Sequence, residues 1–214
     1  MNIIQKIYKY FLKKVYKHLR LLLIKNFGIG RPKTKDKWNE EYSKGKWDYL
    51  LSDIIEEKNT LITKTIFANL ERPNILDVGC GNGALIQSIN EKDFNYYLGV
   101  DKSENALMQF NKKIKKGNKI ELIASEIDKV NFKHQFDCAI FNEVLYYINR
   151  PINTLRRILK HMNEDSLIII SMTVNDNNEK IWNKLSKNIS EVNRFKVKTS
   201  DNSMCRISIY ETLS

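Results

Sequence analysis

Three glycines follow an acidic residue in the stretch ILDVGCGNG, residues 75–83. The whole chain has eight glycines, and Gly79, Gly81 and Gly83 are three of them. Glycine allows a sharp turn at positive φ and lets the backbone approach a ligand that a β-carbon would push away. An ordinary tight turn needs only one or two such residues. The stretch therefore predicts one wall of a small-molecule site, with Asp77 near the end of the strand that leads into it.

The spacing of these glycines bears on the kind of ligand. A dinucleotide fingerprint has the form GxGxxG, in which the third glycine stands one place later than Gly83 does here. That fingerprint also needs open donors for a pyrophosphate. The motif therefore favours a ligand other than a dinucleotide.

Polar residues stand at the ends of three further strand-like runs. Asp101 ends YYLGVD, Glu126 follows IELIAS, and Asn142 and Glu143 follow FDCAIF. In an open parallel sheet, ligands bind beyond the carboxyl ends of the strands, so we expect these side chains to meet the glycine stretch at one edge. Two simpler roles stay open: Asp101 as an acid favoured at a helix N-terminus, and Glu126 as a solvated loop charge.

These residues lie in an alternation of strand-like and helix-like segments. Strands are expected at 74–78, 96–100, 120–124, 136–141 and 167–172, and helices at 53–70, 84–90, 104–115, 152–162 and 178–190. Such alternation implies right-handed crossovers and a parallel sheet that is covered on both faces. Near the C-terminus, two strand-like runs joined by a polar turn at 200–203 predict an antiparallel hairpin. The fold class is therefore α/β: a doubly wound, mostly parallel seven-stranded sheet of the Rossmann-like kind, with a C-terminal antiparallel hairpin.

From about residue 70 to 175, the order of these motifs resembles class I S-adenosylmethionine-dependent methyltransferases, whose first motif is an acid followed by GxGxG. The form EVLYYI is similar to the nodulation-type N-methyltransferases of amino-sugar oligosaccharides. The resemblance implies S-adenosyl-L-methionine as cofactor, with Asp101 on the ribose hydroxyls and the adenine at Glu126 and Ile127, although many relatives have Asp where Glu126 stands. The implied cofactor-binding residues are Asp77, Gly79, Cys80, Gly81, Gly83, Asp101, Lys102, Glu126, Ile127, Asn142 and Tyr42.

Methyl transfer from a sulfonium is an in-line displacement, which requires alignment and, for a hydroxyl acceptor, removal of a proton. Glu143, Tyr146 and Tyr147 follow the fourth strand at the expected edge and are the candidate catalytic residues. We expect His134 and His161 to be structural. Metal-dependent small-RNA methyltransferases have His and additional Glu after this strand, so Tyr146 and Tyr147 imply that no metal is used.

Aromatic residues are dense ahead of the domain, in KWNEEYSKGKWDYLL, residues 37–51. By resemblance to the nodulation-type group, Trp38, Tyr42 and Trp47 form a lid that closes over the methionine part of the cofactor. A packed N-terminal subdomain explains the same residues, and the sequence leaves both interpretations open.

The positive charge of the chain is concentrated at its N-terminus. The net charge is +11, and residues 1–35 hold ten Lys or Arg and no acid, which leaves +1 for the rest. Apolar residues at three- and four-residue spacing, from Ile4 to Leu23, predict an amphipathic helix with a cationic side. The longest apolar run, 21–24, is too short for a secretory signal or for a membrane span of about 20 residues. We expect residues 1–35 to be a basic helix and linker, and 36–214 to be the methyltransferase domain.

Three interpretations of the basic helix stay open: an anionic membrane surface, packing on the domain or a partner, and contact with RNA or DNA. A membrane surface accounts for the apolar stripe and the lysines together. Nucleic acid as a partner uses the charge but leaves the apolar stripe unexplained. A mitochondrial presequence would also lack acids, but it would favour Arg and Ser over Lys.

The composition and the cysteines indicate the size of the core and the compartment of the protein. At 214 residues with 42% hydrophobic residues, the chain can form one sizeable core. Cys80, Cys138 and Cys205 form no CxxC or Cys/His pattern, which indicates neither disulfides nor zinc and favours the cytoplasm. We expect a cytoplasmic enzyme, peripheral at the inner face of the membrane, that methylates an oxygen or nitrogen of a small molecule or a lipid-linked sugar. An RNA methyltransferase guided by the basic arm and a non-catalytic S-adenosylmethionine-binding module are the alternatives.

Overall fold

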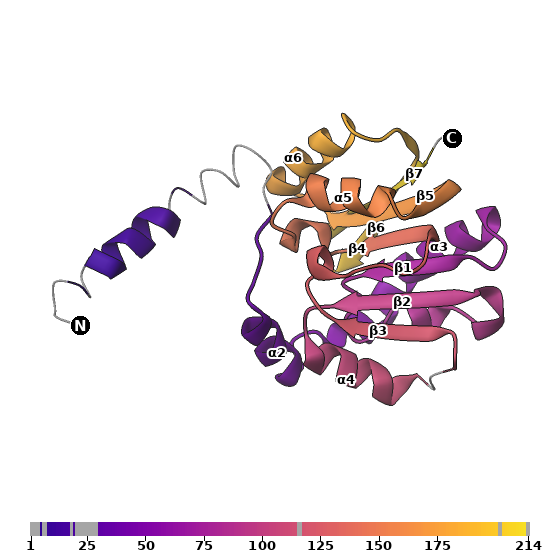
Figure 1. Cartoon of the computed structure of the whole chain (residues 1–214), viewed down its shortest axis with the longest axis horizontal. Coiled ribbons are helices and arrows are strands. Elements are labelled where there is room, and N and C mark those ends of the chain that lie inside the picture. The colour runs from indigo at the N-terminus through magenta and orange to yellow at the C-terminus, as the bar shows by residue number, and fades with distance from the viewer. Residues whose placement is uncertain are drawn as a thin grey trace.

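A seven-stranded sheet forms the centre of the protein (Figure 1). The computed structural model describes residues 5, 8–17, 19, 30–114, 117–200 and 203–212. Across the sheet the strand order is β3-β2-β1-β4-β5-β7-β6. The strands are β1 (Asn74–Val78), β2 (Tyr96–Asp101), β3 (Ile120–Ala124), β4 (Phe136–Asn142), β5 (Met162–Thr173), β6 (Glu191–Ser200) and β7 (Ser203–Glu211).

The first five strands run parallel, and β7 lies antiparallel between β5 and β6. The predicted hairpin of β6 and β7 therefore closes one edge of the sheet, with β6 outermost. Two residues of its predicted turn, 201 and 202, lie outside the described residues. The doubly wound α/β class with a C-terminal antiparallel hairpin is confirmed.

The helices are α2 (Lys35–Ser43), α3 (Asp53–Asn69), α4 (Glu104–Lys113), α5 (Pro151–Leu159) and α6 (Asp176–Leu185). Most of them begin at a residue suited to that position. Ser103 accepts a hydrogen bond from the Ala106 amide at the start of α4, and Asn175 accepts two at the start of α6. Pro151 begins α5, where its missing amide proton costs nothing.

Alternation along the strands divides the core into two layers. On β1, Ile75 packs with α3 and α4 on one face, while Leu76 and Val78 pack with α5 and α6 on the other. Both faces of β1 are thus buried, as expected for a parallel strand between helices. This arrangement leaves the carboxyl ends of the strands as the edge on which a site can form.

The predicted helix at 84–90 is wrong. The segment forms a turn and a short 3-10 helix, Ile86–Ser88, and continues into a second one, Glu91–Asp93. Leu85 and Ile86 have the apolar spacing of a helix and are buried, but a single 3-10 turn already places them in the core. Seven residues are also too few to offset the cost of starting an α-helix.

Smaller differences concern the ends of elements. The helix predicted at 152–162 ends at Leu159, because Met162 pairs with Phe136 and begins β5. β5 is accordingly longer than the predicted 167–172. The helix predicted at 178–190 begins two residues earlier and ends at Leu185. Residue 115, the last of the helix predicted at 104–115, lies outside the described residues.

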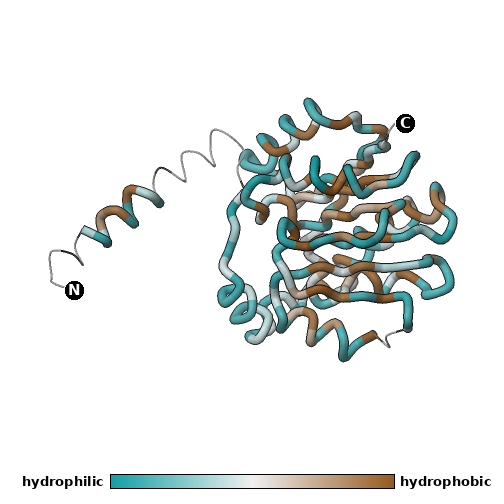
Figure 2. Tube along the Cα trace, viewed as in Figure 1, coloured by the Kyte–Doolittle hydropathy of each residue, from teal (hydrophilic) through white to brown (hydrophobic). Residues whose placement is uncertain are grey.

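Residues 8–17 form a helix that extends away from the domain (Figure 1). Hydrophilic and hydrophobic residues both occur along it (Figure 2). The predicted stripe residues Ile4, Ile7, Leu22 and Leu23 lie outside the described residues. No described helix is long and apolar enough to cross a membrane. Six large apolar or aromatic side chains of this helix are exposed, those of Tyr8, Tyr10, Phe11, Leu12, Val15 and Tyr16, and so is that of Leu19.

Residues 30–34, which the sequence places in a linker, run against the domain. The Arg31 amide donates to the Tyr146 carbonyl at 2.7 Å, and Lys102 Nζ donates to the Lys33 carbonyl at 3.2 Å. Gly30 is buried against Ile148. These contacts attach residues 30–34 to the domain, and the boundary after residue 35 stays a prediction.

Candidate active site

A cavity of about 680 Å³ lies at the carboxyl ends of the parallel strands. Its walls come from the glycine stretch after β1, the loops after β2, β3 and β4, and the segment around α2. Of the fourteen site residues predicted from the sequence, only Gly83 does not line it. The residues that line it are Tyr42, Asp77, Gly79, Cys80, Gly81, Asp101, Lys102, Glu126, Ile127, Asn142, Glu143, Tyr146 and Tyr147.

Asp101 fastens the glycine stretch to the end of β2. The Gly81 amide donates to Asp101 Oδ2 at 3.0 Å, and the Ser103 amide donates to Oδ1 at 2.7 Å. Gly81 has φ +56°, and a β-carbon on it would come within 2.6 Å of the Tyr42 hydroxyl. Glycine is therefore needed here both for the backbone angle and because Tyr42 lies against the loop.

Gly83 serves the packing of the fold. Its φ is +78°, and a β-carbon on it would lie 2.6 Å from the ring of Phe110, on α4. Gly83 is one of the cofactor-binding residues that the family resemblance implies. Since no α-helix follows and Gly83 does not reach the cavity, close contact with Phe110 explains this glycine instead.

Two carboxyl groups, that of the buried Asp77 and that of the half-buried Asp101, give the cavity its electrostatic character. Burial raises the pKa of Asp77 to about 7, although the Tyr97 hydroxyl donates to its Oδ2 at 2.5 Å. Burial also raises the pKa of Asp101 to about 6, against the hydrogen bonds that its carboxylate accepts from backbone amides. Each carboxylate is costly to hold ionised in this environment, so a ligand that brings a positive charge or hydrogen-bond donors is favoured.

Glu126 and Lys102 are already paired with one another. Lys102 Nζ lies 2.6 Å from Glu126 Oε1, and Lys129 Nζ lies 3.1 Å from Oε2. Hydrogen bonds from these lysines lower the pKa of Glu126. Ile127, the next residue, is buried and lines the cavity. If Glu126 contacts adenine as predicted, it does so with a carboxylate that also pairs with Lys102 and Lys129.

Glu143 is held at the end of β4 by donors from three elements. Its Oε2 accepts from the Tyr146 hydroxyl at 2.8 Å and from the Thr173 amide and hydroxyl at 3.1 and 3.0 Å. Its Oε1 accepts from Cys205 Sγ at 3.0 Å. Glu143 has φ +56°, a conformation that is strained for a residue with a side chain and that persists at functional sites.

The two tyrosines after β4 are unsuited to act as bases. Burial and the charge of Glu143 raise the pKa of Tyr146 far above its ordinary value, and burial raises the pKa of Tyr147. Both therefore stay phenols at neutral pH and serve as hydrogen-bond donors. Among the three predicted catalytic residues, Glu143 is left as the acceptor for a proton.

An aromatic cover, made of Trp38, Tyr42, Trp47 and Tyr147, lies over one side of the cavity. Trp38 meets the ring of Tyr147 edge-on, with centroids 4.8 Å apart, and lies 5.5 Å from Trp47. The predicted lid residues and a predicted catalytic residue thus form one cluster. Their positions fit both a lid and a packed subdomain, since the cluster belongs to the folded domain and also lines the cavity.

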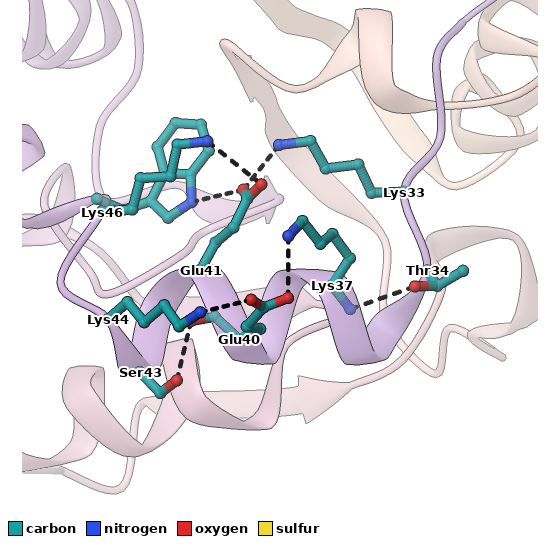
Figure 3. A network of polar contacts seen from close by, with 9 residues as sticks. Lys33, Thr34, Lys37, Glu40, Glu41, Ser43, Lys44 and Lys46 are labelled. Carbon is teal, nitrogen blue, oxygen red and sulfur yellow. Dashed lines mark hydrogen bonds and ion pairs between the residues drawn. The ribbon is translucent and has the colours of Figure 1, made fainter.

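Lys33 fastens the aromatic cover. Its Nζ lies 4.3 Å from the ring centroid of Trp38 and 5.2 Å from those of Trp47 and Tyr147. The same ammonium pairs with Glu41 Oε2 at 2.7 Å, and Figure 3 shows Lys33 and Lys46 converging on that carboxylate. A lysine over aromatic rings and a buried carboxylate contributes on the order of 1 kcal/mol or more.

We expect Lys33→Met to weaken the binding of S-adenosylhomocysteine about fivefold, because loss of about 1 kcal/mol from the cover leaves it less often closed. Lys46→Met is the matched control, since Lys46 pairs with Glu41 at 3.3 Å but its side chain is 60% exposed. Calorimetric titration of the two variants checks this. Equal affinities would show that closure of the aromatic cover does not contribute to binding.

Several cavity residues were not predicted from the sequence. Lys58 and Asn59 come from α3, and Thr173 ends β5. Thr199 and Ser203 come from the hairpin. The rule that polar residues gather at strand ends would have found Thr173. The others depend on how α3 and the hairpin pack beside the strands, which no local pattern reveals.

Two histidines and further residues of metal-ligating types lie within the described part of the chain. His134 packs on Tyr96 and His161 on Phe132, and neither lines the cavity. Within the described part of the chain, no three His, Cys, Asp or Glu residues are grouped to hold a metal ion. That the enzyme uses no metal stays a prediction.

The cavity residues fit S-adenosylmethionine. The carboxylates of the cavity favour a positive sulfonium and hydroxyl donors. Asp101 keeps lone pairs beyond those that accept from the Gly81 and Ser103 amides. Asn82, in the glycine stretch, is fully buried, and neither atom of its amide has a partner among the described residues. Such unpaired atoms are costly and mark a place where a further hydrogen-bonding group fits.

Comparison with known proteins places the chain in a family. A family model described as a methyltransferase domain matches residues 45–197. Curated relatives include a tRNA U34 carboxymethyltransferase of Campylobacter fetus, 31% identical over 49% of this chain and 38% of that protein. A ubiquinone biosynthesis O-methyltransferase of Rickettsia akari is 28% identical over 58% of this chain and 48% of that protein. The chain thus spans less than half the length of these relatives.

Solved structures show the same fold at lower identity. The N-methyltransferase NodS of Bradyrhizobium japonicum, in complex with S-adenosylhomocysteine, has a TM-score of 0.74 and 16% identity, over 84% of this chain and 98% of that chain. Magnesium protoporphyrin IX methyltransferase of Synechocystis has a TM-score of 0.65 and 17% identity, over 84% and 95%. Because the family model matches residues 45–197 and the glycine stretch has the form of the first motif, this chain belongs to the methyltransferase-domain family and is a class I S-adenosylmethionine-dependent methyltransferase.

Proposed function

We propose that this methyltransferase acts on an oxygen or nitrogen of a small or lipid-linked acceptor at the cytoplasmic surface of an anionic membrane. Bound S-adenosylmethionine supplies the activated methyl group. The solved neighbours NodS and magnesium protoporphyrin IX methyltransferase carry its product or the cofactor itself, which supports the same ligand here.

The chain's own residues divide the work within the cavity. The Asp101 carboxylate accepts hydrogen bonds from the ribose hydroxyls, and the glycine stretch lets the nucleoside approach β1. The aromatic cover excludes water from the reacting centre, which strengthens every electrostatic interaction inside it. Glu143 accepts the proton of a hydroxyl acceptor, with Tyr146 donating to Glu143 Oε2 to hold the carboxylate in place.

The observation that carries the membrane part is the exposure of the helix at residues 8–17. Its apolar side chains are open to solvent, with Phe11 61% and Leu12 47% exposed, and Lys9, Lys13, Lys14 and Lys17 are exposed beside them. A helix of this kind buries its apolar side at the headgroup boundary, while each lysine near acidic lipid adds about 1 kcal/mol.

The test compares the full chain with the triple variant Phe11→Ser/Val15→Ser/Leu19→Ser in flotation with vesicles that contain phosphatidylglycerol. We expect the variant to lose most of its vesicle binding and to keep its affinity for S-adenosylhomocysteine. Vesicles of phosphatidylcholine alone control for the charge. Unchanged flotation of the triple variant would contradict the proposal that this helix binds a membrane surface.

RNA is the second candidate acceptor, and one observation favours it. Several relatives, from Campylobacter fetus and Vibrio cholerae among others, are named tRNA U34 carboxymethyltransferases. An RNA substrate predicts micromolar binding that falls steeply with salt. Titration with tRNA at two salt concentrations distinguishes it, because the triple variant keeps every lysine and should bind RNA as well as the full chain does.

A further inference from the structure

A buried lysine with no partner lies in the wall of the cavity. Lys58, on α3, is 2% exposed and lines the cavity. Among the described residues, no hydrogen bond or ion pair reaches its ammonium group. A buried charge is costly unless it is paired, and lysines are almost never fully buried without a partner. The cavity is the side from which such a partner can come.

The neighbours of Lys58 place it in the half of the cavity away from the predicted nucleoside site. Its neighbour in sequence, Asn59, accepts a hydrogen bond from Asn142 Nδ2, at the end of β4, at 3.2 Å. The charge of Lys58 opposes the rise that burial causes in the pKa of the Cys205 thiol, on β7. Asp101 ends β2 and Glu126 follows β3, both on the opposite side of β1.

No described carboxylate of the cavity forms an ion pair with Lys58. Glu143 and Lys58 both act on the pKa of the Cys205 thiol, yet among the described residues no ion pair joins them, and Glu143 accepts hydrogen bonds from Tyr146, Thr173 and Cys205. Asp77 hydrogen-bonds to Tyr97 instead. The Lys58 ammonium group is therefore without an ion-pair partner among the described residues, in the wall of the cavity.

We propose that Lys58 binds a carboxylate or phosphate group carried by the methyl acceptor. This inference rests on the proposed methyl transfer and narrows its acceptor to an anionic compound. It is independent of the membrane, because a free phosphate ester and a lipid-linked one present the same group to Lys58. An ammonium group suits either anion as a point charge with three donors.

The experiment uses the full chain with Lys58→Met, which removes the charge at similar length, and Lys58→Arg, which keeps it. Each protein is saturated with S-adenosylhomocysteine and titrated with inorganic phosphate or acetate at constant ionic strength, with chloride as the reference. The readout is the thermal unfolding temperature. We expect phosphate or acetate to raise it in the wild type and in Lys58→Arg, and the rise to be lost in Lys58→Met. The anion that raises the unfolding temperature identifies the group that Lys58 binds.

A second measurement separates the acceptor from the cofactor, whose amino-acid part also has a carboxylate. Affinities for S-adenosylhomocysteine and for 5′-methylthioadenosine, which lacks that carboxylate, are compared by calorimetry. We expect Lys58→Met to change both by less than about twofold. A tenfold loss for S-adenosylhomocysteine alone would assign Lys58 to the cofactor and overturn the proposal.

Folding of the variant is itself informative. Removing an unpaired buried charge is expected to leave the ligand-free protein as stable as before or more so. A large fall in the unfolding temperature of Lys58→Met without ligand would instead show that Lys58 is paired within the fold, and the proposal would fail. Binding of S-adenosylhomocysteine by the wild type tests the methyltransferase site separately.

Discussion

Asp101→Asn should weaken the binding of S-adenosylhomocysteine by about 100-fold, since a hydrogen bond to a charged group contributes roughly 1.5–3 kcal/mol and the ribose offers two hydroxyls. An amide also presents a donor to one of the two backbone amides, Gly81 or Ser103, that now donate to the carboxylate. The loop and the ribose thus lose their common acceptor. Isothermal titration calorimetry measures the change.

Asp165→Asn is the matched control for this variant. Asp165 is exposed, within β5 at the edge opposite the cavity, and the substitution is the same. We expect its affinity for S-adenosylhomocysteine to equal that of the wild type. If Asp101→Asn bound as tightly as Asp165→Asn, the ribose would be held elsewhere.

The pH dependence of binding gives the same assignment a second test. Burial raises the pKa of Asp101 to about 6, and hydroxyl donors on its carboxylate lower that pKa in the complex. The affinity of the wild type should therefore be constant above that pH and fall by up to tenfold per unit below it. Asp77, whose pKa is about 7, titrates nearby, so the part of the slope that Asp101→Asn removes is the part due to Asp101.

The sequence predicted the parts of the site that follow from sheet topology. Asp101, Glu126 and Glu143 stand at or just after the ends of strands that the apolar runs mark clearly, and parallel strands bring those ends to one edge. The glycine stretch was recognised because its composition is unusual for this chain. These residues could be assigned without knowledge of how any helix packs.

Residues that depend on helix packing could not be assigned in this way. Lys58 stands in the run EEKNT, which looks solvent-exposed, and only the packing of α3 beside β4 and β7 buries it. Lys33 looked like part of a linker because Gly, Pro and lysines surround it. Its contacts with Trp38 and Glu41 form only when residues 30–34 fold back over the cavity. The segment at 84–90 shows the converse, since its apolar spacing suggested a helix that the short loop does not form.

Glu143→Gln should lower methyl transfer by at least 100-fold, because a positioned general base typically contributes 10²–10⁴ in rate. The substitution removes the charge with little change of shape. The remaining oxygen can still accept from Tyr146 and Thr173, while the new amide faces the sulfur of Cys205. Labelled methyl transfer into a membrane extract measures the rate, and Glu164→Gln, exposed at the opposite edge, is the control.

The affinity for S-adenosylhomocysteine decides how a loss of rate in Glu143→Gln is interpreted. A base acts on the acceptor, so the affinity should stay within about threefold of the wild type while the rate falls. A parallel fall in affinity would make Glu143 a residue that positions the cofactor. Full activity would mean that the acceptor needs no base, as for an amine that reacts without its proton, and that the strained backbone at Glu143 serves only to join β4 to β5 and β7.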